Sequence, residues 1–149
     1  MLFSPDMLIK VLDGTKTQTR RPVKNMDWIR WSLPSDAPEF LDATHHEYAA
    51  AMTIDNGYTI VGIERAGRAL WMVGNAYAVC PGRGQKAVAR IRILDIRAQS
   101  PSLISEADAR AEGFDSREAF WDKLRSLYGD GVDLDALYWA LTFELVKGD

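Results

Sequence analysis

One short segment near the start of the chain concentrates side chains that could do chemistry. Residues 14–21 include Lys16, Thr19, Arg20 and Arg21, together with two further threonines. A threonine hydroxyl is a weak nucleophile until a base removes its proton, and a neutral lysine can be that base. A lysine is neutral at pH 7 only if burial or a nearby cation lowers its pKa, and both arginines could contribute to that. The alternative is a solvated, threonine-rich strand with ordinary surface charges.

The neighbouring elements decide whether these groups can meet. A short helix is expected just before them, with Ser4 as its cap, Pro5 at its first position and Gly14 at its end. Lys16 and Thr19 are three residues apart, so on a regular strand they would point to opposite faces. They can meet only if the backbone bends after Gly14. The chemistry also needs a carboxylate from elsewhere, to handle a proton on the leaving group.

The composition is that of a globular protein. With 149 residues, 47% apolar and 26% charged, residues 1–149 are expected to form a single domain with a substantial core. The one cysteine, Cys80, excludes an internal disulfide and fits a reducing compartment. The sequence has no secretory signal pattern and no apolar run of about 18 residues. We therefore expect a cytoplasmic protein without a membrane partner.

Charge is distributed unevenly along the chain. The formal net charge of −3 argues against a general polyanion binder. However, residues 1–104 carry 13 Lys/Arg against 10 Asp/Glu, whereas residues 105–149 carry 5 against 11. Arginine outnumbers lysine 12 to 6, and its side chain is suited to phosphate contact and to stacking on bases. No DNA-specific motif is present. The alternative to phosphate or base contact is that these arginines form an ordinary solvated polar surface.

The pattern of elements predicts an α+β fold. We expect strands over residues 16–21, 49–54, 58–63, 69–73, 76–80, 86–97 and 136–146, and an irregular stretch over residues 22–48. Asn56-Gly57 favours a hairpin between the second and third of these. Ser105, and then Asp115 or Ser116, should cap two helices. The second helix has an apolar face that is expected to be core, formed by Phe120, Trp121, Leu124, Leu127 and Tyr128.

Three segments together resemble a known family. The motif Gly14-x-Lys16-x-x-Thr19-x-Arg21 resembles the signature of ASCH domains. Residues 104–114, which contain Ser105-x-x-Asp108 and Glu112-Gly113-Phe114, are similar to the second block of that family, and Phe143-Glu144-Leu145 is similar to its last strand. The resemblance implies a PUA-like small β-barrel flanked by short helices. Residues 22–70 would then be a long insertion.

The resemblance also implies chemistry on RNA or on a modified nucleoside. Some small members of the family are amidohydrolases that deacylate acetylcytidine with a lysine, a threonine and a glutamate. By motif these are Lys16, Thr19 and Glu112, although a shift of one helical turn would exchange Glu112 for Asp108. Arg21 would contact the substrate. The alternatives are a non-catalytic RNA-binding module and a ribonuclease that uses the same basic cleft. No cofactor or metal is expected, because one cysteine and the adjacent His45-His46 give no zinc-ligand spacing.

Further candidates for RNA contact lie outside this motif. Trp28, Arg30 and Trp31 interleave aromatic rings with a cation, as single-strand binders do. The alternative is that the tryptophans anchor the insertion on the barrel. The glycine-rich turn at residues 81–86 offers Arg83 and Lys86 to a phosphate, but it has no following helix start and is therefore not a P-loop. Arg20 is a further candidate for contact with substrate or RNA.

Overall fold

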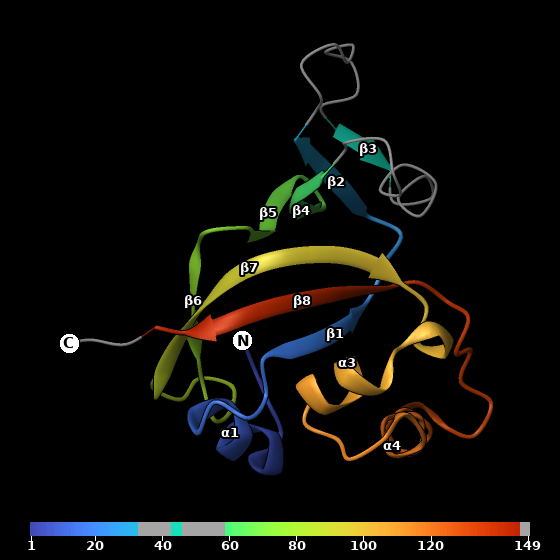
Figure 1. The fold of residues 1–149 in the computed structure, drawn as a ribbon. Helices are drawn as coiled ribbons and strands as arrows, with labels where there is room; N and C mark the ends of the chain where they lie inside the picture. Colours follow the sequence, from blue (N-terminus) through green and yellow to red (C-terminus); the bar gives the residue numbers. More distant parts are fainter. Residues whose placement is uncertain (33–42, 46–58, 147–149) are drawn as a thin grey trace.

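The computed structural model describes residues 1–32, 43–45 and 59–146. In this part of the chain, two four-stranded antiparallel sheets curl into a small barrel, and helices cover one side of it (Figure 1). The α+β class and the small barrel flanked by short helices are confirmed.

The first sheet contains Thr19 and Arg21 of the motif that resembles the ASCH signature. Its strand order is β1-β8-β7-β6. The strands span Gln18–Pro22 (β1), Tyr138–Leu145 (β8), Ala89–Gln99 (β7) and Ala76–Val79 (β6). In β1, Thr19 lies opposite Leu141 of β8. Because β1 is at the edge of this sheet, its side chains can reach the helices beside it as well as the barrel.

The second sheet is built largely from the predicted insertion. Its order is β3-β2-β4-β5. The strands span Ala43–His45 (β3), Asp27–Ser32 (β2), Thr59–Arg65 (β4) and Arg68–Met72 (β5). The expectation that residues 22–48 are irregular is therefore wrong for β2 and β3. Ile29 and Trp31 alternate with the more exposed Trp28 and Arg30, which is the period of a strand with one buried face.

The core lies between the two sheets. It consists of Ile29, Trp31, Ile60, Ile63 and Trp71 from the second sheet and Ile93, Ile96, Trp139 and Leu141 from the first. Ile93 and Ile96 are an odd number apart, yet both are buried, because the β7–β8 register shifts between Ile93 and Asp95. Each fully buried side chain of this size contributes roughly 1.5–3 kcal/mol relative to an exposed one.

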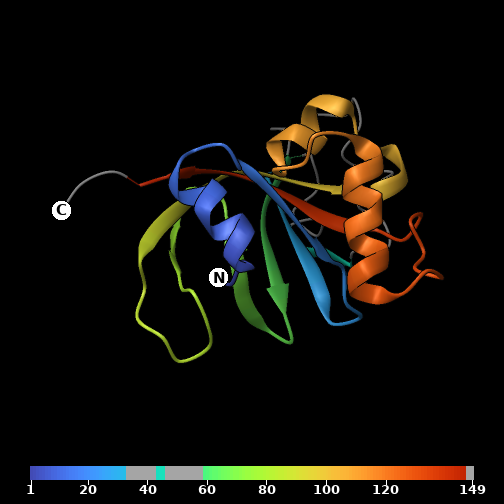
Figure 2. The same ribbon diagram turned by 90° about the horizontal axis from the view of Figure 1, so that it is seen from below.

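The helices lie beside the edge strand β1. They span Pro5–Leu12 (α1), Pro101–Leu103 (η3, a 3-10 helix), Glu106–Ala111 (α3) and Arg117–Tyr128 (α4). The Ser105 hydroxyl accepts a hydrogen bond from the Asp108 amide (3.0 Å), and the Ser116 hydroxyl accepts one from the Ala119 amide (3.1 Å). The predicted Ser105 cap is confirmed, and of the two candidates for α4 it is Ser116 that caps. Ser4 occupies the N-cap position of α1, but its side chain forms no cap hydrogen bond. Figure 2 shows α1 and α4 on the same side of the strands, with β1 passing between them.

Some expectations about individual elements need correction. In α4, Phe120 and Leu124 are buried, but Leu127 and Tyr128 are 58% and 54% exposed, so the last turn of the helix extends beyond the core. The strands expected over residues 69–73 and 76–80 exist as β5 and β6 but belong to different sheets. The expected strand over residues 49–54 and its Asn-Gly turn lie outside the described residues. No helix in the described part of the chain is long and apolar enough to cross a membrane.

Candidate active site

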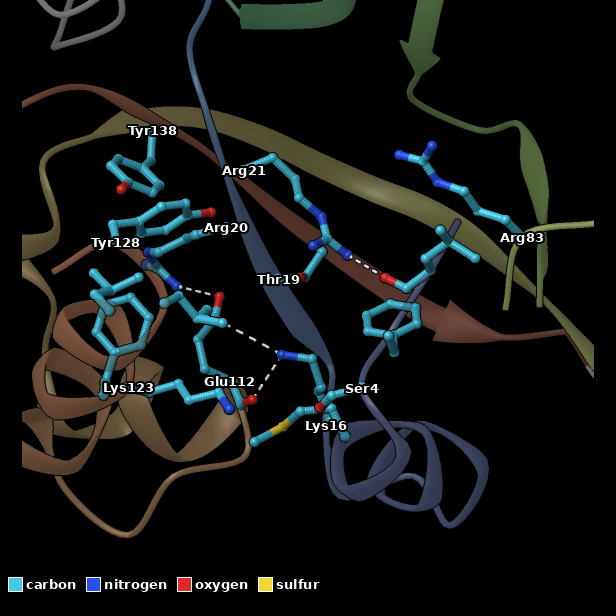
Figure 3. Close-up of a pocket in the computed structure, with 16 residues that line it drawn as sticks. Ser4, Lys16, Thr19, Arg20, Arg21, Arg83, Glu112, Lys123, Tyr128 and Tyr138 are labelled. Atoms are coloured by element: carbon cyan, nitrogen blue, oxygen red, sulfur yellow. Dashed lines mark hydrogen bonds and ion pairs between the residues drawn. The ribbon is translucent and has the colours of Figure 1, made fainter. Parts of the chain in front are cut away.

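A cavity of about 690 Å³ opens between β1, α1 and α4 (Figure 3). Ligand pockets of small molecules typically measure about 300–1,000 Å³. Its lining comes from the start of the chain and α1 (Leu2, Phe3, Ser4, Met7), from β1 and the residues before it (Lys16, Thr19, Arg20, Arg21), and from Arg83, Glu112, Phe120, Lys123, Leu124, Leu127, Tyr128 and Tyr138. All three residues of the predicted Lys-Thr-Glu set therefore line one cavity.

A bend before β1 brings Lys16 and Thr19 to the same cavity. Gly14 has a φ of +85°, a left-handed conformation that favours glycine. The Lys16 amide then donates to the Lys10 carbonyl (3.0 Å), and the Thr17 amide donates to the Ala111 carbonyl (2.8 Å). Since β1 begins only at Gln18, Lys16 lies before the strand and the alternation of strand faces does not apply to it.

Glu112 is the carboxylate that meets Lys16. It follows the last residue of α3 as the C-cap, and Gly113 then turns the chain with a φ of +101°. Lys16 Nζ lies 3.3 Å from Glu112 Oε1 and also donates to the Glu112 backbone carbonyl (2.7 Å). Both side chains are about 95% buried. Asp108, one turn earlier in α3, instead accepts a hydrogen bond from Gln18 Nε2 (3.0 Å).

Arg20 holds the second oxygen of the same carboxylate. Its Nη1 donates to Glu112 Oε2 (3.0 Å) and to Gln18 Oε1 (3.0 Å), and its Nη2 donates to Gln99 Oε1 (2.9 Å). The Arg20 side chain is only 1% exposed. Arg20 lines the cavity, as a predicted substrate-contact residue should, but its guanidinium already donates to Glu112, Gln18 and Gln99. The Glu112 carboxylate is thereby held between two cations, Arg20 and Lys16.

The buried setting of Lys16 favours its neutral form. Desolvation by burial is the largest effect and lowers the pKa of Lys16 below its ordinary 10.5. The ion pair with Glu112 acts in the opposite direction, and the positive charges of Arg21 and Arg20 lower the pKa further. The net effect is a lowered pKa, which is the property that a lysine general base requires.

Thr19 and Arg21 are two residues apart on β1 and therefore lie on the same face of the strand. The Thr19 hydroxyl forms no hydrogen bond with any described residue, and Lys16 Nζ directs its two hydrogen bonds to Glu112. The hydrogen bond between a nucleophile and its general base often forms only once substrate is bound. Arg21 Nη2 donates to the Leu2 carbonyl (2.8 Å), and its guanidinium lies 5.3 Å from the Phe3 ring centre. Burial lowers the pKa of Arg21 as well, although arginine remains charged.

The other residues predicted to bind RNA are placed differently. Arg83 lines the cavity, whereas Lys86 is exposed on the same turn and does not. Trp28 and Arg30 lie on β2, outside the cavity lining. Trp31 is 3% exposed and packs in the core, so its predicted stacking on RNA is corrected and the anchoring alternative holds for it. No described residue between positions 22 and 70 lines the cavity.

Several residues of the cavity were not expected from the sequence. Phe3 enters the cavity because Leu2 forms a bridge with Cys80 at the end of β6. Lys123 and Tyr128 reach it from α4, and Tyr138 from β8. The helical spacing from Phe120 indicated that Leu127 and Tyr128 lie on the same face of α4 as Phe120. Nothing in the sequence indicated that Leu2 and Phe3 reach the cavity. In the described part of the chain, no group of three His, Cys, Asp or Glu side chains could hold a metal ion.

Comparison with known proteins identifies the fold. No protein-family model and no curated protein matches the chain. A crystal structure of an ASCH domain from Lactobacillus crispatus JV V101 superposes with a TM-score of 0.52 and 17% identity, over 92% of this chain and 68% of that chain. A DUF984 protein from Enterococcus faecalis V583 gives a TM-score of 0.48 and 19% identity, over 93% and 68%. The chain therefore has an ASCH-like fold.

Proposed function

We propose that the protein is an amidohydrolase that removes the acyl group from the exocyclic amine of an acylated cytidine. The observation that carries the proposal is the meeting of Lys16, Thr19 and Glu112 in one cavity, with Lys16 Nζ 3.3 Å from Glu112 Oε1. The ASCH-like fold supports it, because the sequence motif that resembles the ASCH signature is the one that supplies Lys16 and Thr19.

The proposed reaction has two steps. Neutral Lys16 accepts the proton of the Thr19 hydroxyl while Thr19 Oγ1 attacks the acyl carbonyl carbon. The bond between the acyl carbon and the exocyclic nitrogen of cytosine then breaks, and that leaving nitrogen takes a proton from the Lys16–Glu112 pair. The result is free cytidine and an ester on Thr19. Water hydrolyses that ester and returns Thr19 to its hydroxyl form, with the acid as the second product.

The electrostatic requirements of these steps match the cavity. The carbonyl oxygen becomes negative during attack, and the Arg21 guanidinium on the same strand face as Thr19, or a backbone N–H, would stabilise it. One such donor contributes on the order of 3 kcal/mol in acyl-transfer enzymes. The general base contributes about 10²–10⁴-fold. Arg20 does not touch the substrate in this scheme, but it keeps the Glu112 carboxylate oriented toward Lys16.

A turnover assay tests the proposal. Purified protein is incubated with N4-acetylcytidine, and cytidine is measured by chromatography. We expect release by the wild type, and a loss of at least about 10²-fold in Lys16→Met and in Glu112→Gln. Glu144→Gln is the matched control, because Glu144 is an exposed acid on β8 outside this cavity.

The outcome also separates the alternatives. Unchanged turnover in Lys16→Met or Glu112→Gln would exclude the Lys-Thr-Glu mechanism. Absence of cytidine release by the wild type would leave a non-catalytic binding module or a ribonuclease. These two differ in whether a labelled single-stranded RNA is cut or only retained.

A further inference from the structure

We infer that the cavity takes a phosphorylated nucleoside, a mononucleotide, and that Arg83 together with Arg21 contacts its phosphate, so that the oxyanion donor of the proposed reaction is a backbone N–H and not Arg21. The inference rests on the proposed function only in assuming that a nucleoside occupies the cavity. It adds a substrate class, because an acylated nucleoside by itself carries no negative charge for these arginines to recognise.

The first argument is the charge that remains after the internal pairs are formed. Lys16 and Arg20 share the single carboxylate of the cavity lining, which belongs to Glu112. Arg21, Arg83 and Lys123 also line the cavity, and none of them forms an ion pair with a described carboxylate. An acidic protein, with a net charge of −3, thus keeps an excess of positive charge in this one cavity.

The second argument is the supply of free donors. A guanidinium has five N–H donors in a planar fork that matches the oxygens of a phosphate. Arg21 uses one of them, on the Leu2 carbonyl (2.8 Å), and Arg83 uses none on a described residue. The Leu2 contact and the Phe3 ring hold the Arg21 guanidinium in place before any ligand arrives. Preorganised, charge-assisted donors of this kind favour an anion.

The third argument is the layout of the cavity. Figure 3 shows Arg83 on one side, Tyr128 and Tyr138 on the opposite side, and Arg21 between them, with Lys16 and Glu112 below. The tyrosine side also contains Leu127, and both Leu127 and Tyr128 are more than half exposed. Aromatic rings can stack on a base, while arginines bind the phosphate. Arg83 and the two tyrosines therefore lie on opposite sides of Arg21 (Figure 3), as the phosphate and the base lie at opposite ends of a nucleotide.

The charge distribution favours a mononucleotide over a long RNA. The helices α3 and α4 carry four acidic and four basic residues, but residues 129–137, which follow α4, carry Asp130, Asp133 and Asp135 and no Lys or Arg. Phosphates of a chain that extended past α4 would meet this acidic surface. A single phosphate beside Arg83 would not.

Calorimetric titration of the full chain tests the inference. The probes are cytidine, uridine, adenosine and guanosine, the 5′- and 3′-monophosphates of each, inorganic phosphate, and a short single-stranded RNA. We expect at least one monophosphate to bind about tenfold or more tightly than its nucleoside at low salt. Arg83→Gln should remove most of that advantage, and Arg83→Lys should restore part of it, because lysine keeps the charge without the bidentate fork. Arg68→Gln, which removes an exposed arginine of the other sheet, should leave it intact.

Four results would overturn the inference. These are equal affinity for nucleoside and monophosphate in all four sets, a phosphate advantage that survives Arg83→Gln, inorganic phosphate binding as tightly as the monophosphates, and tighter binding of the RNA than of every monophosphate. Because none of these probes carries an acyl group, failure of N4-acetylcytidine turnover would refute the proposed function alone. Turnover without any phosphate advantage would refute this inference alone.

Discussion

Replacement of Glu112 by glutamine should destabilise the fold, because one buried carboxylate neutralises two buried cations. Its oxygens lie 3.3 Å from Lys16 Nζ and 3.0 Å from Arg20 Nη1, and the side chain is 5% exposed. Removal of one partner from a buried ion pair costs about 3–5 kcal/mol. We expect the lower end, about 3 kcal/mol, because glutamine still offers an acceptor to Arg20, and because Lys16, with its lowered pKa, can lose its proton.

The assay is urea unfolding at pH 7, followed by tryptophan fluorescence. Trp139 is fully buried in the core and reports on its exposure. A loss of about 3 kcal/mol corresponds to a fall of roughly 6–12 °C in Tm for a chain of this size. Glu144→Gln is the control: its carboxylate is 53% exposed and lies 3.7 Å from Arg92, so less than about 1 kcal/mol is expected. If Glu112→Gln were no more destabilising than Glu144→Gln, the buried pairing described above would be wrong.

Two further predictions concern stability and pH. Because the pKa of Lys16 is lower in the folded protein than its ordinary 10.5, the unfolded chain binds more protons between the two values. The free energy of unfolding should therefore rise with pH across that window, and Lys16→Met should reduce this slope in urea titrations between about pH 7 and 10. Asp27 is fully buried; burial raises its pKa, but hydrogen bonds from Arg65, Lys24 and Trp139 outweigh this and lower it. The contribution of ionised Asp27 to the free energy of unfolding should be present above its ordinary pKa of 3.8 and be lost as the pH falls through the lower pKa of the folded protein. Asp27→Asn should weaken this dependence of stability on acid pH. An acid dependence unchanged in Asp27→Asn, or a slope unchanged in Lys16→Met, would contradict the corresponding prediction.

The sequence was informative wherever a local signal determined the structure. Ser105 and Ser116 were predicted as caps because a hydroxyl that precedes a helix by this spacing satisfies an otherwise free amide. Gly14 and Gly113 have left-handed φ values, which local patterns can indicate. The Lys-Thr-Glu set was proposed from motif resemblance, and the structure brings its three members to one cavity.

The remaining features depend on contacts between distant segments. That Trp31 is core and Trp28 more exposed follows from pairing of β2 with β4, which the local aromatic and cationic pattern did not indicate. Arg20 pairs with Gln99 and Glu112, which are 79 and 92 residues away, so its role in fixing the carboxylate had no local signal. Likewise, β5 and β6 are consecutive in the chain but belong to different sheets, because β5 pairs with β4 and β6 pairs with β7. The short turn between them, at Gly74, does not indicate this.

Thr19→Val tests the central claim most directly, because valine keeps the shape of threonine and removes only the proposed nucleophile. The measurement is release of cytidine from N4-acetylcytidine, together with mass spectrometry of the rapidly quenched protein. We predict that the wild type releases cytidine, that any acetyl group trapped on the protein is on Thr19, and that the variant releases none above background. Equal turnover by the wild type and Thr19→Val would contradict the account.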